Sequence, residues 1–233
     1  IDFSLRAFSV YGGISVLLLG SLLLPGFISN TYLRALNTAC LIAIGALVGR
    51  MVIGAFYSFK HNNPPELPDE LPSVSIIIPA YNEESVLEET IEACAQLDYP
   101  REKYEAIICY ESDCTDATGE IAEKADEKYG FVNAVERDEE GGGKARATNY
   151  ALERAENEVI ALIDADHQYR PDALKNAVRW FQRDNIWCVK GRCFGRNPES
   201  SLITLHATLE RHIAERIDIY GRHAMKGYTY FGG

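Results

Sequence analysis

The sequence has little basic charge: 23 lysine and arginine residues stand against 34 aspartate and glutamate residues in a chain of 233. The resulting net charge of -11 is a poor electrostatic match for nucleic acid, so we expect no nucleic-acid partner. Residues 1–63 carry a balance of +3, which leaves -14 for residues 64–233. If this acidic part binds a phosphorylated ligand, a metal ion or a local basic cluster must offset the field.

The cysteines lack the spacing of a metal or redox motif. No Cys-x-x-Cys pair occurs among the six, and none stands at zinc-binding spacing with a histidine. Cys109 with Cys114, and Cys188 with Cys193, are near enough in sequence to meet in space. We nevertheless interpret all six as scattered, mostly buried thiols of a reducing compartment.

Two other catalytic spacings are missing. His206, Glu210 and His212 do not form a His-Glu-x-x-His motif, so we interpret them as surface or packing residues and not as zinc ligands. The glycines before Lys144 do not form a phosphate-binding P-loop, because the motif's spacing is absent and alanine follows the lysine.

Long apolar runs occupy the N-terminal quarter. No charged residue occurs in residues 7–33, and the apolar core with its flanks is long enough to cross about 30 Å of hydrocarbon. A cleaved signal peptide would have a shorter core and a small-residue cleavage site. Residues 35–59 form a second apolar stretch with a single charge. We predict a transmembrane hairpin over residues 1–60 of a multi-pass cell-membrane protein; a long soluble hairpin is the alternative.

Features within and after the second apolar stretch refine this topology. Its single charge, Arg50, either extends to the nearer interface or faces protein or water within a bundle. Gly45 and Gly49 are spaced for a close helix contact. Lys60 and its neighbours form a basic flank, so we expect the following domain to be cytoplasmic. Four prolines then predict a stiff linker over residues 61–72.

From residue 73 onward, apolar strand-like runs alternate with amphipathic helical patterns. This alternation predicts an α/β domain over residues 73–233, with a mainly parallel sheet flanked by helices. Ligands of such sheets bind at the carboxyl ends of the strands. The predicted strands are 74–78, 104–110, 132–135 and 159–163, and the predicted helices are 83–97, 117–129, 144–155, 171–183 and 199–225.

The fourth predicted strand ends in two carboxylates, Asp164 and Asp166. Side chains at i and i+2 of an extended chain lie on the same side, so both can face one point. Magnesium and manganese accept oxygen ligands, and one or two carboxylates beside a nucleotide diphosphate form a suitable site. The alternative is a solvated turn after a buried strand, in which Asp166 caps the next element.

Other strand ends carry further candidate ligand contacts. In the loop Pro79–Glu84, Asn82 is a good N-cap for the following helix, whereas Tyr81 is expected to open on the ligand crevice. Glu111 follows the second strand, where its carboxylate can accept a hydrogen bond from a base N–H. Lys144 follows three glycines at a helix start and can meet phosphate; a flexible loop with a solvated lysine is the alternative.

Taken in order, these motifs resemble those of family 2 inverting glycosyltransferases, which have the nucleotide-sugar-binding GT-A fold. The order makes the combined match specific although each part is weak. The two apolar spans and the Gly-Lys-Ala before Asp-Ala-Asp resemble the membrane-embedded synthases of hyaluronan, chitin and cellulose most, and dolichyl-phosphate sugar synthases second. The matching segments are Val74–Glu83, Thr115–Thr118, Gly143–Asn149, Asp164–Asp166, Pro171–Leu174 and Phe231–Gly233.

The resemblance implies a metal-dependent hexosyltransferase that moves a sugar, with inversion, from a nucleotide sugar to a growing polysaccharide or lipid-linked acceptor. A UDP-sugar is the expected donor, and membrane lipid an expected partner. Asp166 would bind Mn²⁺ or Mg²⁺, Asp164 would contact sugar or ribose, and Lys144 would lie near the diphosphate as the third catalytic candidate. The other implied positions are the donor-binding Pro79, Tyr81, Glu83 and Glu111 and the acceptor-side Phe231 and Gly232.

The sequence departs from the family pattern in two places. Glu111-Ser112-Asp113-Cys114 stands where Asp-Asp-Gly-Ser is usual, so which carboxylate contacts the base stays open. The family's acidic base motif and its Gln-x-x-Arg-Trp motif have no counterpart before Gly233. Because the sequence also begins without an initiator methionine, we interpret it as part of a longer chain with the catalytic base beyond Gly233. A nucleotidyltransferase, or a non-catalytic membrane protein with a transferase-like binding domain, are the rival functions.

Overall fold

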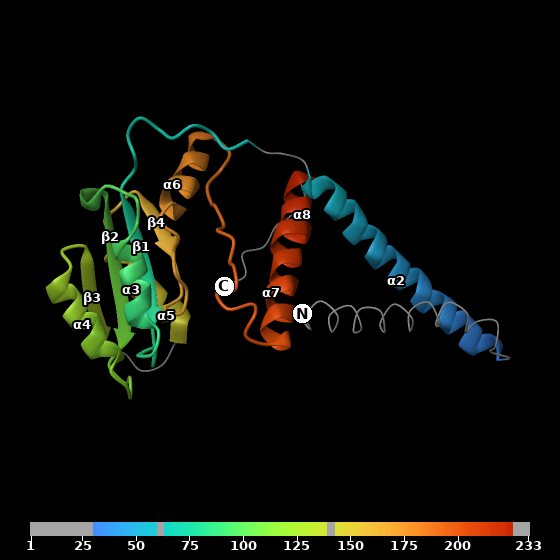
Figure 1. Ribbon diagram of the computed structural model, residues 1–233, viewed down its shortest axis with the longest axis horizontal. Helices are drawn as coiled ribbons and strands as arrows, with labels where there is room; N and C mark the ends of the chain where they lie inside the picture. The colour runs from blue at the N-terminus through green and yellow to red at the C-terminus, as the bar shows by residue number, and fades with distance from the viewer. Residues whose placement is uncertain (1–29, 60–62, 139–142, 226–233) are drawn as a thin grey trace. The chain divides into compact units, whose positions relative to one another are not determined.

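The computed structural model describes residues 30–59, 63–138 and 143–225 (Figure 1). The chain divides into two compact units. One consists of residues 63–191 and contains the sheet, and the other combines the N-terminal helix with residues from 192 onward. We describe each unit by itself.

The sheet has four parallel strands in the order β3-β2-β1-β4. Their bounds are β1 (Val74–Ala80), β2 (Tyr104–Glu111), β3 (Val132–Arg137) and β4 (Val159–Leu162). The prediction of a parallel α/β sheet is therefore confirmed. Because all four strands run in the same direction, their carboxyl ends, and the polar residues that follow them, lie along one edge.

Helices cover both faces of this sheet. Alternate residues of β1 face opposite sides: Ile76 and Ile78 belong to the core shared with α3 (Leu87–Ala95) and α4 (Thr118–Lys128), whereas Ile77 packs with α5 (Gly143–Leu152). Burial of both strand faces explains the continuous apolar run in the sequence. A short 3₁₀ turn (Arg101–Lys103) precedes β2, and after β4 follow α6 (Ala173–Val178) and a second 3₁₀ turn (Arg179–Gln182).

The loop after β1 differs from the prediction. Its helix, α3, begins at Leu87 instead of Glu83, and Val86 occupies the N-cap position without a side-chain hydrogen bond. The prediction that Asn82 caps this helix is wrong. Asn82 has a left-handed φ of 56°, which asparagine tolerates, and its side chain bonds to the neighbouring loop instead.

The C-terminal helical region is mostly as predicted, with one irregularity. The structure has α7 (Leu202–Ile213), a π-helical turn (Ala214–Ile219) and α8 (Tyr220–Ala224) where one continuous helix was predicted. Ser201 explains the start at Leu202, because its Oγ accepts a hydrogen bond from Thr204 N while Thr204 Oγ1 accepts one from Ser201 N.

The helix α2 (Thr31–Ser58) belongs to the same unit as α8. The two helices pack closely where two glycines meet, since a Cβ atom added at Gly221 would collide with the backbone of Gly54. Arg216 strengthens the contact: its Nη1 donates to the Ser58 carbonyl at 2.9 Å, in the last turn of α2, where helix carbonyls lack intrahelical partners.

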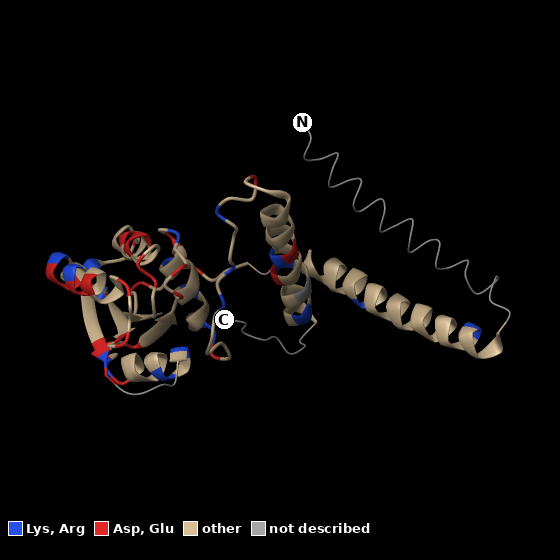
Figure 2. Ribbon diagram, turned by 90° about the horizontal axis from the view of Figure 1, so that it is seen from below, with Lys and Arg blue, Asp and Glu red and all other residues tan. Residues whose placement is uncertain are grey.

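Among the described residues, α2 is the one helix long and apolar enough to cross a membrane, with a mean hydropathy of 2.1 in its most apolar window. Figure 2 shows its ribbon almost free of charge. The first predicted span lies outside the described residues. At Gly45 and Gly49, for which a close helix contact was predicted, no described atom beyond the neighbouring turns of α2 lies within 4 Å of an added Cβ. The close contact is at Gly54.

The cysteines are all free, and their burial is mixed. Cys94 and Cys109 are buried, whereas Cys40 and Cys188 are exposed, so the prediction of mostly buried thiols is wrong for part of the set. Burial raises the pKa of Cys94 to about 12 and that of Cys109 to about 11. Both thiols therefore stay protonated at neutral pH and are poor nucleophiles.

Candidate functional site

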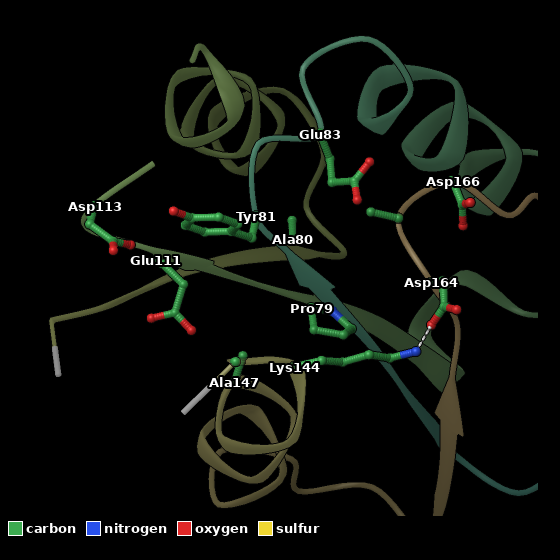
Figure 3. Close-up of a pocket in the computed structure, with 12 residues that line it drawn as sticks. Pro79, Ala80, Tyr81, Glu83, Glu111, Asp113, Lys144, Ala147, Asp164 and Asp166 are labelled. Atoms are coloured by element: carbon green, nitrogen blue, oxygen red, sulfur yellow. Dashed lines mark ion pairs between the residues drawn. The ribbon is translucent and has the colours of Figure 1, made fainter. Parts of the chain in front are cut away.

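A cavity of about 460 Å³ opens at the carboxyl ends of the strands (Figure 3). Residues from the ends of β1 and β2, from the loops that follow β1, β2 and β4, and from α5 line it. Figure 3 shows Tyr81, Glu111 and Asp113 toward one end and Glu83, Asp164 and Asp166 toward the other. The full lining is Pro79, Ala80, Tyr81, Glu83, Glu111, Asp113, Gly143, Lys144, Ala147, Asp164, Ala165 and Asp166.

The loops after β1 and β2 hold each other in place through side chain to backbone hydrogen bonds. Asn82 Oδ1 accepts from Thr115 N at 2.8 Å. Glu84 Oε2 accepts from Ala117 N at 3.0 Å, and Asp116 Oδ2 accepts from Glu84 N at the same distance. This reciprocal bonding fixes the loop that carries Tyr81 and the loop that follows Glu111, a form of preorganisation that lowers the cost of binding.

Glu111 is held by a buried arginine. Its Oε2 lies 2.5 Å from Nη1 of Arg137, at the end of β3, and the side chains are 11% and 1% exposed. Removing two charges from water is costly unless they pair closely, as these do. The other oxygen of Glu111, Oε1, is buried and has no hydrogen-bond partner among the described residues. Because this oxygen is covered, a ligand N–H would reach it only after the neighbouring side chains shift, and would then satisfy the acceptor.

Lys144 reaches across the cavity floor to Asp164. Its Nζ lies 2.5 Å from Asp164 Oδ1 (Figure 3), and the two side chains are partly exposed. Lys144 is the second residue of α5, and Gly143 before it has a φ of 56°, a conformation that a residue with a Cβ rarely adopts. The glycine thereby lets the helix begin beside the cavity with the lysine in its first turn.

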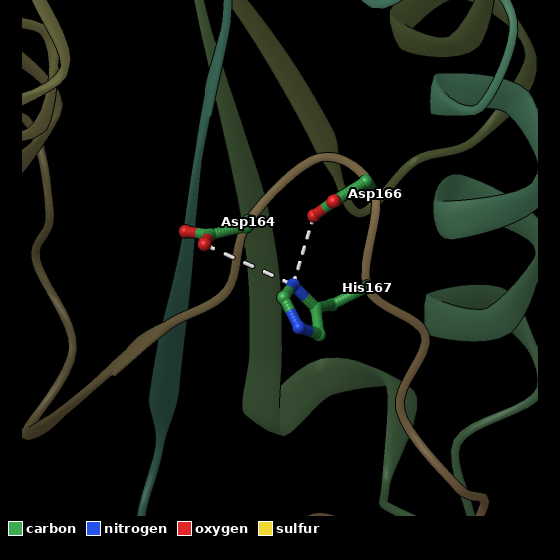
Figure 4. Close-up of side chains that lie close together, drawn as sticks. All are labelled: Asp164, Asp166 and His167. Atoms are coloured by element: carbon green, nitrogen blue, oxygen red, sulfur yellow. Dashed lines mark ion pairs between the residues drawn. The ribbon is translucent and has the colours of Figure 1, made fainter. Parts of the chain in front are cut away.

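The loop after β4 gathers three potential metal ligands (Figure 4). Ligand atoms of Asp164, Asp166 and His167 all lie within 4.8 Å of one another. His167 Nδ1 is 2.9 Å from Asp166 Oδ1 and 3.8 Å from Asp164 Oδ2. Two carboxylates and an imidazole are a donor set that suits manganese, and the carboxylate oxygens suit magnesium.

The pKa of Glu83 reflects the negative charge at this end of the cavity. Burial raises the pKa of its carboxyl above the ordinary value of 4.5, and the negative charges of Asp166, Asp116 and Asp164 raise it further. Three carboxylates that disfavour the ionisation of a fourth form a negative field that attracts a cation.

The sequence-predicted donor residues all line this one cavity: Pro79, Tyr81, Glu83, Glu111, Lys144, Asp164 and Asp166. Phe231 and Gly232, predicted on the acceptor side, lie outside the described residues. Sequence reasoning missed Arg137, because the third strand was predicted to end at residue 135 and its carboxyl end was therefore not searched. It also missed His167, which directly follows the Asp-Ala-Asp signal.

Comparison with known proteins decides the family. Residues 75–231 match the family model described as glycosyl transferase family 2. The chain belongs to glycosyl transferase family 2. This agrees with the resemblance found in the motifs.

Two curated relatives and one solved structure illustrate the range of the family. The chain is 30% identical over 153 residues to a beta-monoglucosyldiacylglycerol synthase of Nostoc sp., covering 65% of this chain and 32% of the relative. It is 32% identical over 160 residues to the probable glycosyltransferase YdaM of Bacillus subtilis, covering 66% and 38%. The chain thus spans about a third of the length of these relatives.

The solved structure is the mannosyltransferase PcManGT from Pyrobaculum calidifontis in complex with GDP-Man and Mn²⁺. It is 29% identical, with a TM-score of 0.54, and the match covers 70% of this chain and 48% of that one. This supports the GT-A type of fold predicted from the sequence. Neither curated relative is named as a polysaccharide synthase, so that finer expectation stays a prediction.

Proposed function

We propose that the protein transfers a hexose, with inversion, from a UDP-sugar to a glycan or lipid-linked acceptor at a membrane, with the help of Mn²⁺ or Mg²⁺. The observation that carries the proposal is the cavity itself. A lysine, a cluster of carboxylates, an aromatic ring and a buried unpaired acceptor converge on about 460 Å³ at the carboxyl edge of a parallel sheet.

The end of the cavity with Tyr81 and Glu111 suits a nucleobase. The Tyr81 side chain is half exposed, so its ring face can stack on the base. Glu111 Oε1 has no hydrogen-bond partner among the described residues and can accept from a base N–H. Uracil carries a single N–H between two carbonyls, which matches one available carboxylate oxygen when the other is engaged by Arg137. Guanine would use two adjacent donors, and adenine and cytosine have an acceptor on the equivalent edge. Uridine is therefore our choice of donor nucleoside.

The opposite end suits a diphosphate and its cation. Asp164 is already neutralised by Lys144, which leaves Asp166, with 61% of its side chain exposed, as the first ligand of the cation. His167 stands beside it and offers a ring nitrogen as a further ligand. When bound, Mn²⁺ or Mg²⁺ supplies positive charge that stabilises the departing diphosphate.

Lys144 has a second task in the reaction. The oxygen of an acceptor hydroxyl forms a bond to the anomeric carbon of the sugar while the bond from that carbon to the diphosphate oxygen breaks. The hydroxyl proton leaves to a base that we assign to none of the described residues. Lys144, within reach of the breaking bond, would stabilise the negative charge that builds up on the leaving oxygen.

The membrane part of the proposal rests on α2, whose length and composition suit a span. The Nostoc relative is named for a glycolipid product, which makes a lipid-linked acceptor a fitting choice alongside a growing glycan. Lys60 and its basic flank favour a cytoplasmic catalytic domain, as the sequence predicted.

Calorimetric titration of the detergent-solubilised full chain tests the donor and the cation together. UDP-glucose, UDP-N-acetylglucosamine, GDP-mannose and ADP-glucose should each be titrated with Mn²⁺ and with EDTA. We expect binding of a UDP-sugar in Mn²⁺ and at least about a hundredfold weaker binding in EDTA. Preference for the GDP-sugar would overturn the uridine assignment, and equal binding in EDTA would overturn the cation.

Two further measurements separate the rival functions. Release of pyrophosphate from a sugar phosphate and a nucleoside triphosphate would favour a nucleotidyltransferase. Release of UDP from a bound UDP-sugar in the presence of membrane glycolipids would favour the transferase. Tight donor binding with neither product would favour a non-catalytic binding protein.

A further inference from the structure

Thr90, on α3, is fully buried and reaches the loop that carries the candidate metal ligands. Its Oγ1 lies 2.6 Å from the carbonyl oxygen of Ala165 and 3.0 Å from that of His167. The side chain is 1% exposed. These two carbonyls flank Asp166 in the chain, so the hydroxyl bonds to the backbone on both sides of the residue expected to meet the cation.

The Thr90 hydroxyl bonds to the loop in preference to its own helix. A threonine hydroxyl has one hydrogen, which it shares between acceptors within reach. Buried carbonyl oxygens without a partner are costly, and no strand continues past Leu162 to satisfy those of this loop. The carbonyl of Val86, one helical turn back, is farther away at 3.4 Å. The hydroxyl therefore serves the loop more than its own helix.

A second bond from the same helix supports the loop from outside. Gln168 Nε2 donates to Glu89 Oε2 at 2.8 Å, but this pair is exposed. Solvent competes with an exposed bond, whereas the buried Thr90 contact is protected from water. Thr90 is therefore the contact that we expect to determine the loop's geometry.

We propose that Thr90 is a positioning residue that fixes the backbone around Asp166 and thereby aims its carboxylate at the cation. The proposal rests on the cation site of the proposed function. A carboxylate on a loosened loop must be ordered when the cation binds, and that ordering lowers affinity. Thr90 itself touches neither the cation nor the donor.

Thr90→Val is the sharpest test, because valine keeps the branched shape and loses the hydroxyl. In the full chain, the dissociation constant of Mn²⁺ alone, measured by the electron paramagnetic resonance signal of the free ion, should rise about fivefold to tenfold. Hydrogen–deuterium exchange of peptides covering residues 163–170 should accelerate by at least about fivefold. Thr90→Ser should keep both values within about twofold of the wild type, because serine retains the hydroxyl.

Thr38→Val is the matched control. Thr38 Oγ1 donates to the Arg34 carbonyl at 2.9 Å within α2, so this change removes the same group from a helix in the other unit. It should leave Mn²⁺ affinity and exchange of residues 163–170 unchanged. If Thr90→Val does not fold, Thr90→Ala makes the same deletion with less crowding.

Unchanged Mn²⁺ affinity in both Thr90→Val and Thr90→Ala, whatever their thermal stability, would overturn the proposal, because a structural role alone would lower stability without weakening the ion's binding. A wild-type chain that binds no Mn²⁺ would refute the cation site instead. Hydrogen–deuterium exchange of residues 163–170 would then still show whether the Thr90 hydroxyl holds the loop. Exchange at the wild-type rate in Thr90→Val would refute that role as well.

Discussion

The two ends of the cavity differ in their access to water. At the end with Tyr81, the carboxylate of Glu111 is 11% exposed and paired with an arginine that is 1% exposed. At the other end, Asp164 is 29% exposed and Asp166 is 61% exposed. The Glu111 carboxylate is thus shielded from water and held in an ion pair, whereas the Asp164 and Asp166 carboxylates are in contact with solvent.

This difference fits two kinds of recognition. A carboxylate that is shielded from water and held in place discriminates strongly between bases, because a base without an N–H at the matching position leaves the carboxylate oxygen without a hydrogen bond. Solvated carboxylates can exchange water for a cation at little cost, and their mutual repulsion is relieved by its charge. We therefore expect substitutions at the Glu111 end to affect the stability of the fold and the selectivity for the base. Substitutions at the Asp166 end should affect metal-dependent binding.

Arg137→Met should have the largest effect. Breaking a buried ion pair from one side costs about 3 to 5 kcal/mol, because the other charge stays largely buried without compensation. Denaturant unfolding of the full chain, followed by tryptophan fluorescence, measures this loss. The double variant Arg137→Met/Glu111→Met removes both charges and should recover most of the lost stability; a double variant as unstable as the single one would mean that packing, not charge, dominates here.

Asp166→Ala should come second and should act on binding. Loss of the exposed ligand should raise the dissociation constant of the UDP-sugar in Mn²⁺ at least about a hundredfold, or about 2.7 kcal/mol. Binding in EDTA should stay the same, since the variant lacks only the cation's ligand. Titration heats in Mn²⁺ that match those of the wild type would remove Asp166 from the cation site.

Glu111→Gln should change binding less than Asp166→Ala does, and the change should be visible as selectivity. It also leaves Arg137 without its counter-charge, so the variant should lose stability as Arg137→Met does. A hydrogen bond to a charged group contributes about 1.5 to 3 kcal/mol, so UDP binding should weaken about tenfold or more. Glutamine can also donate to the acceptor nitrogen of cytosine, so the preference for UDP over CDP should shrink. Competition titrations with both nucleotides measure this ratio, and an unchanged ratio would place the base elsewhere.

Glu83→Gln should have the smallest effect, seen in the pH dependence of stability without metal. Because folding raises the pKa of Glu83 above 4.5, the folded state binds its proton more readily than the unfolded chain does. That contribution is fully present below pH 4.5 and is lost as the pH rises through the folded-state pKa. The stability of the variant should therefore fall less than that of the wild type between pH 4 and neutrality. Thermal melts in EDTA measure this, and the same dependence of Tm on pH in both proteins would contradict the raised pKa of Glu83.

Much of the fold could be read from the sequence, for reasons that particular residues show. Ile76, Ile77 and Ile78 form a continuous apolar run because both faces of β1 are covered, and such runs between amphipathic helices specify a parallel sheet. Polar residues after each run then mark the ligand edge. The misplaced cap at Asn82 shows the limit, since its bond goes to Thr115, far along the chain.

Periodicity and motif order by themselves determined the class of fold, the family and the candidate residues at the cavity, because these depend on local patterns and on the direction of the strands. Tertiary structure alone decided the pairing of Glu111 with Arg137, of Lys144 with Asp164 and of Thr90 with the loop after β4. Each of these contacts joins residues at least 20 positions apart. Which partner a charged or hydroxyl group meets, and how dry the contact is, depends on packing that no local pattern encodes.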